Sequence, residues 1–106
     1  MTQAGGGETP AAPPATDAWT QLVHAVFRAV RGMSPIARVS TGERLEDAAL
    51  QAIREMAAGR PAVAAQWLAT VDLLLGVATE LGDLSAAARS SVDSALGAAR
   101  TTLPGA

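Results

Sequence analysis

The segment from Ala62 to Gly82, AVAAQWLATVDLLLGVATELG, carries only two charged residues, Asp72 and Glu80. So long an apolar run must be shielded from water, because exposing this much apolar surface is unfavourable. Three environments provide that shielding: the core of a helical bundle, a second copy of the chain, or a membrane. The choice among these three constrains the fold more than any other feature of the sequence.

The composition favours one small soluble domain. A chain of 106 residues suits a single domain. Eight basic residues, all Arg, stand against ten acidic ones for a net charge of −2, which offers no clustered positive surface for nucleic acid. The absence of Cys excludes disulfides, thiolate metal sites and a cysteine nucleophile. The 25 Ala residues and the absence of Lys are typical of a GC-rich bacterial genome.

Residues 1–16 are expected to form a disordered tail. This segment contains three consecutive Gly and three Pro, and it has no large apolar side chain after Met1. It cannot bury enough area to offset the entropy of ordering it. Because it has neither a basic start nor an apolar run, it is not a signal peptide, and we expect the protein in the cytoplasm.

The first half of the domain predicts two amphipathic helices, at about 17–31 and 41–58. Their apolar residues recur three and four positions apart, which places them on one face of each helix. The intervening segment, GMSPIARVSTG at 32–42, is expected to be a loop because Pro35 disfavours helix at Ser34. Ser40 and Glu43 fit a capping box for the second helix, and Ile36 and Val39 are expected to pack back onto the core.

The second half predicts helices at about 61–81 and 85–100. Gly59 ends the preceding helix, and Pro61 suits the first turn of the next. The helix at 61–81 has a broad apolar arc and a stripe of small residues; the arc consists of Val63, Trp67, Val71, Leu74, Leu75, Ala78 and Leu81, and the stripe of Ala62, Ala65, Ala69 and Gly76. Leu73 and Val77 project from the opposite, solvent side, beside Gln66, Thr70 and Glu80. The last helix has a thin inner stripe made mostly of Ala.

The fold class that follows is all-α: a four-helix up-and-down bundle spanning 17–103 after the tail. One alternative is a helical-hairpin repeat, because GRPAVAA and GDLSAAA resemble the inter-helix turn of tetratricopeptide repeats, although their offset and aromatic positions do not fit. A membrane span is disfavoured. Inserting Asp72 costs about 2.5 to 3.5 kcal/mol, which offsets most of what the Leu and Val residues contribute.

No motif predicts catalysis, a metal or a cofactor. His24, the sole histidine, lies on the polar face of the first helix near Arg28, as in phosphotransfer domains, but Phe27 stands where such a site needs a cation. Asp72 is expected at the edge of the core arc, within reach of water or a neighbouring Arg. Arg28, Arg31 and Arg38 form a mild basic cluster for an acidic surface or a phosphate.

The leading hypothesis is therefore a non-enzymatic interaction or oligomerisation module that associates with itself or with another protein. Five residues are the interface candidates: Leu73, Val77, Gln66, Trp67 and Trp19. One alternative is a bundle that binds a small apolar ligand between Trp67, Leu74 and Met56, with Asp72 or Arg54 as its polar anchor. Another is a phosphotransfer or other catalytic role centred on His24.

Overall fold

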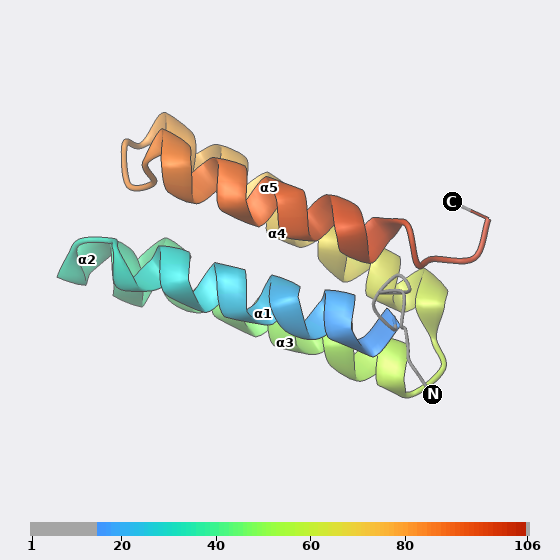
Figure 1. Cartoon of the computed structure of the whole chain (residues 1–106). Helices are drawn as coiled ribbons and strands as arrows, with labels where there is room; N and C mark the ends of the chain where they lie inside the picture. Colours follow the sequence, from blue (N-terminus) through green and yellow to red (C-terminus); the bar gives the residue numbers. More distant parts are fainter. Residues whose placement is uncertain (1–14, 106) are drawn as a thin grey trace, which may run out of the picture.

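The chain folds into an all-α, four-helix up-and-down bundle (Figure 1). The computed structural model describes residues 15–105, so the expected tail lies almost entirely outside the described residues. Within that range the helical segments are α1 (Ala15–Arg31), α2 (Pro35–Ala37), η1 (Arg38–Gly42), α3 (Glu43–Ala57), α4 (Pro61–Glu80) and α5 (Ala86–Arg100). No strand occurs among these residues.

The four long helices form a ring in which each helix packs against two others. The packed pairs are α1 with α3, α3 with α4, α4 with α5, and α5 with α1. Figure 1 shows the result as two layers, with α1 and α3 in one and α4 and α5 in the other. Of the four packed pairs, α4 and α5 make the least extensive contact. Each helix therefore has one arc turned toward its neighbours and one arc turned outward.

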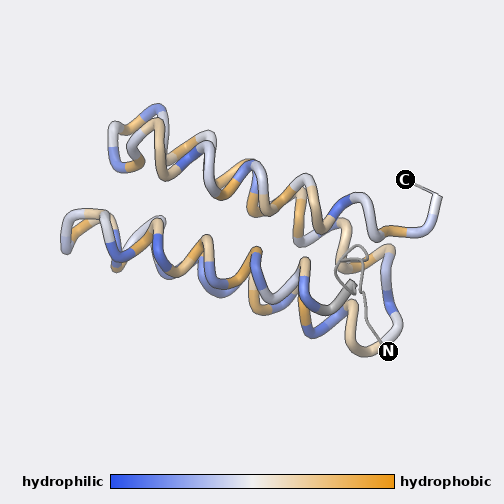
Figure 2. The backbone as a smooth tube through the Cα atoms, in the orientation of Figure 1, coloured by the Kyte–Doolittle hydropathy of each residue, from blue (hydrophilic) through white to orange (hydrophobic). Residues whose placement is uncertain are grey.

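The core is built from large side chains and from alanines that let the helices approach one another. The fully buried large residues are Trp19, Leu22, Val26, Leu45, Leu68, Val71, Leu75, Val92 and Leu96. Buried alanines lie between them on every long helix, including Ala49, Ala64 and Ala99. Figure 2 shows hydrophobic positions recurring along each long helix, as the sequence pattern predicted.

The prediction of a loop at 32–42 was wrong, because the chain is already helical from Pro35. Pro35 occupies the first helical position, where its missing N–H costs nothing, and Ser34 Oγ accepts a hydrogen bond from Ala37 N at 3.3 Å. Proline thus starts this helix rather than preventing it. The predicted capping box is not used, since Ser40 Oγ donates to the carbonyl oxygens of Ile36 and Ala37.

This early helix also overturns the expected burial of Ile36 and Val39. Their exposed fractions are 80% and 67%. The α2 and η1 turns direct Ala37, Thr41 and Gly42 inward instead. The wider π turn of η1 sets that orientation, which a sequence pattern with a period of 3.6 residues does not describe.

Gly59 ends its helix as the sequence predicted, and Gly82 lies in the turn after α4. Gly59 and Gly82 have φ values of 77° and 75°, the left-handed conformation that L-residues with side chains rarely adopt. Pro61 is the first residue of α4. These turns reverse the chain after α3 and after α4, which produces the up-and-down order.

Gly42 is required for a different reason, the close approach of η1 to α1. A Cβ atom at this position would lie 2.8 Å from Cγ1 of Val30 and 3.3 Å from the carbonyl oxygen of Ala37. Both distances are too short, and the branched Val30 side chain has little rotamer freedom in a helix. The two segments can therefore meet only at a residue without a side chain.

We expect Gly42→Ala to lower the free energy of unfolding by about 1 to 3 kcal/mol through overpacking. The matched control is Gly97→Ala in α5, where a Cβ would meet nothing within 4 Å. That substitution should stabilise the fold by about 0.5 to 1 kcal/mol, because Ala is the better helix former. Urea denaturation followed by circular dichroism measures both, and equal effects at the two glycines would contradict the close approach.

Candidate functional site

The outer face of α4 presents large apolar side chains to solvent. Leu73, Val77 and Leu81 have exposed fractions of 68%, 40% and 65%. They are spaced four residues apart and so form one ridge along the helix, which we call the outer ridge. Of the exposed large hydrophobic residues in the described chain, only Ile36 and Val39 lie elsewhere.

A hollow of about 440 Å³ lies along the outer ridge. Its lining residues are Asp72, Leu73, Gly76, Val77, Glu80 and Leu81. A Cβ atom at Gly76 would meet nothing within 4 Å. Gly76 lies beside Leu73 and Glu80 on the helix surface and adds no side chain there, so the hollow stays open and an incoming side chain can occupy it.

The N-terminal half of the same face is lined by small residues. Ala62 and Ala69 are exposed, Ala65 is half-buried, and Gln66 is exposed between them. The predicted stripe of small residues therefore lies largely outside the core. Large and small apolar residues occupy opposite halves of one helix face.

Charged residues border this face on the side of α5. The Asp72 carboxylate lies 3.7 Å from Arg89 Nη2 and 3.5 Å from Arg100 Nη2. Arg89 also donates from Nε to both carboxylate oxygens of Asp93 at 3.1 Å, and from Nη1 to Thr79 Oγ1 at 2.9 Å. Asp72 thus lies at the edge of the core and faces Arg side chains of a neighbouring helix, where its ion pairs connect α4 to α5.

Two of the interface candidates are less accessible than the outer ridge. Trp67 is half-buried and packs against the core. Trp19 is only 1% exposed, and its indole N–H donates to Thr102 Oγ1 at 2.7 Å. The expectation that Trp19 contacts a partner is therefore not supported, because its ring lies in the core and its one donor is already satisfied.

Leu81 is a residue of this face that the sequence pattern assigned to the core. Conversely, Leu68 was not among the predicted inner residues, yet it is 1% exposed. The cause is that α4 is apolar around most of its circumference, so the pattern leaves its rotation open. Its neighbours fix that rotation and place the outer ridge outside.

The residues of the ligand-binding alternative occupy different environments. Trp67, Leu74 and Met56 are partly buried and pack against the core. Arg54 is exposed on α3, whereas Asp72 faces α5. The two candidate polar anchors thus lie on different sides of the bundle from one another, and the ligand-binding alternative stays a prediction.

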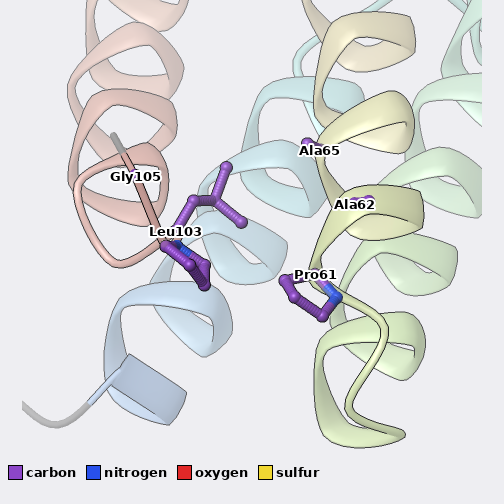
Figure 3. Close-up of a pocket in the computed structure, with 6 residues that line it drawn as sticks. Pro61, Ala62, Ala65, Leu103 and Gly105 are labelled. Atoms are coloured by element: carbon purple, nitrogen blue, oxygen red, sulfur yellow. The ribbon is translucent and has the colours of Figure 1, made fainter.

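A different apolar pocket lies at the end of the bundle, where the C-terminal segment meets α4. It measures about 340 Å³ and is lined by Pro61, Ala62, Ala65, Leu103, Pro104 and Gly105. Figure 3 shows Leu103 and Pro61 facing one another across it. Local sequence pattern does not indicate this pocket, because it depends on how the C-terminal segment packs beside α4. The Trp19–Thr102 hydrogen bond holds that segment near α1.

The remaining candidates are surface features. His24 is exposed on α1, as is Arg28 one turn later. Arg38 of the basic cluster donates from Nε to the carbonyl oxygen of Met33 and from Nη2 to that of Arg31, both at 3.2 Å. This guanidinium therefore satisfies carbonyls at the end of α1. In residues 15–105, no three His, Cys, Asp or Glu side chains are grouped to hold a metal ion.

Helix α4 is also long and apolar enough to cross a membrane by length and composition. Only 28% of its most apolar 18-residue stretch is buried within the bundle. Comparison of the chain with protein-family models, curated proteins and solved structures gives no match.

We expect the Asp72–Arg89 pair to contribute little to stability. Because Asp72 is 46% and Arg89 27% exposed, a double-mutant cycle with Asp72→Asn and Arg89→Gln should give a coupling of about 0.2 to 1 kcal/mol. That coupling should shrink in high salt, since exposed charges are screened. Denaturant unfolding of the wild type, the two single variants and the double variant, at two salt concentrations, measures this coupling. A coupling of several kcal/mol would contradict the solvent-exposed position of the Asp72–Arg89 pair.

Proposed function

We propose that this protein is a non-enzymatic interaction module that docks another protein surface on the outer face of α4. The observation that carries the proposal is the outer ridge, Leu73, Val77 and Leu81, standing exposed on a long regular helix. Contiguous apolar side chains on a helix face are typical of protein contacts, whereas single scattered ones need no explanation.

Energetics support a docking role for this ridge. Burying the exposed part of each of the three side chains contributes on the order of 1 to 2 kcal/mol. The ridge belongs to a helix whose other face is fixed in the core by Leu68, Val71 and Leu75. Its side chains are thus already positioned, and little backbone entropy is lost when a partner covers them.

The hollow at Gly76 adds shape to the same surface. An apolar ridge beside an open hollow allows interdigitation with a partner helix, in which side chains of one helix enter gaps of the other. A smooth apolar face would provide area without this fit. The outer face of α4 combines both features.

We expect Leu73→Glu combined with Val77→Glu to abolish the association of the full chain while leaving its helix content unchanged. Two carboxylates at the contact would have to be desolvated without partners. Light scattering after size exclusion, over a range of concentrations, measures self-association. Recovery of co-purifying proteins on the tagged chain measures association with others, and far-UV circular dichroism measures helix content.

The matched control is Ile36→Glu with Val39→Glu. It also replaces two exposed apolar side chains by carboxylates, but on α2 and η1 rather than on α4. This control should associate as the unchanged chain does. The proposal fails if all three chains show the same mass and recover the same proteins.

A further inference from the structure

The outer face of α4 carries a seven-residue pattern of small side chains. Ala62, Ala69 and Gly76 recur every seven residues, and the positions between them are occupied by Gln66, Leu73 and Glu80. The spacing alternates four and three residues, which is the spacing of a seam along which two helices pack. Five of these six residues are exposed, and the sixth, Gly76, is half-buried and lines the hollow.

We propose that the partner of this face is a second copy of the chain, bound with its α4 antiparallel to the first. This inference rests on the proposed docking role of α4 and adds the identity and orientation of what docks. The contact is symmetric about a two-fold axis that crosses α4 near Val71, the middle of the helix. Both copies then use the same face, as an isologous dimer requires.

Side-chain size supports this register. With Ala69 level with the partner's Leu73, Gln66 is level with the partner's Gly76, and Ala62 with the partner's Glu80. Every level then joins a small residue to a larger one, so the helices approach closely and the longer side chain fills the space. In a parallel pair, each residue would oppose its own copy. Gly76 opposite Gly76 would leave a gap, and Leu73 opposite Leu73 would hold the helices apart.

Charge also favours the antiparallel pair. Arg60 precedes the first residue of α4, whereas Glu80 ends it and Asp83 follows in the turn. Arg60 Nε donates to Glu55 of its own chain, and its side chain remains 59% exposed. The antiparallel register places it between the partner's Glu80 and Asp83. It separates the two Glu80 residues by roughly 27 Å along the axis, from 1.5 Å of rise per residue. A parallel pair would place Glu80 against Glu80, and it would also align the helix dipoles unfavourably.

The register explains Gln66, a polar residue that lies between Ala62 and Ala69 on the seam. Its side chain would lie over the partner's Gly76, beside the hollow that stays open among residues 15–105. There its amide can donate a hydrogen bond to the partner's Glu80 on the rim. A polar seam residue that needs such a partner specifies register in paired helices.

Single-cysteine variants test this arrangement directly, since the chain has no cysteine of its own. Ala62→Cys and Glu80→Cys, both at exposed positions, are mixed, one of them tagged, and oxidised mildly. The antiparallel register brings residue 62 of one copy level with residue 80 of the other. It holds like positions roughly 27 Å apart, well beyond disulfide reach. We expect mixed disulfide dimers to exceed self-linked dimers by about tenfold.

His24→Cys on α1 is the control for chance collision, because His24 is exposed and distant from α4 in sequence. It should cross-link with neither variant above background. Wild-type light scattering should show a mass approaching twice that of the chain as concentration rises. Mixed cross-linking together with that mass supports the antiparallel dimer.

Other outcomes overturn the inference, and they separate it from the proposed function. Self-linked dimers of each variant would mean a parallel pair, and a monomer that binds a different protein through Leu73 and Val77 would mean another partner; both keep the docking role of α4. A monomer that binds lipid vesicles, with binding lost in Leu73→Glu with Val77→Glu, would overturn both proposals. A monomer with no partner would do the same.

Discussion

The structure depends on one constraint: a ring of four helices gives each helix only two neighbours. Each helix can bury only the arc between those neighbours, and the opposite arc must meet solvent or something else. Helices α1, α3 and α5 fit this arrangement because their outward arcs are polar. Helix α4 does not, since it is apolar on both arcs and only 28% of its most apolar stretch is buried. The outer ridge is the consequence of that mismatch.

The sequence predicted what depends on local pattern. The apolar spacing of α1, α3 and α5 indicated their inner faces, and Gly59 and Pro61 marked the turn between α3 and α4. The exposure of Leu73 and Val77 was also predictable, because they share a side of α4 with Gln66 and Glu80. These features require only knowledge of which residues lie on which side of a regular helix.

The features that sequence reasoning missed depend on contacts between distant segments or on irregular backbone. The rotation of α4, which buries Leu68 and exposes Leu81, is decided by its neighbours because its own pattern is nearly uniform. The Trp19–Thr102 hydrogen bond joins residues 83 positions apart, and no local signal encodes it. The helix that begins at Pro35 was not predicted, because proline disfavours helical backbone at the residue before it. Proline nevertheless suits the first turn of a helix that it begins.

The charged residues between α4 and α5 help to explain how association through α4 would stop at two chains. Asp72, Arg89 and Arg100 line the edge of the docking face and are already paired with one another, so the apolar surface does not extend across α5. An isologous contact uses the same patch on both copies, so its formation leaves no matching patch to propagate a fibre. The outer face of α4 carries alanines in its N-terminal half and the outer ridge in its C-terminal half. Such a face is complementary to itself only when reversed, which makes a closed antiparallel pair its natural complement.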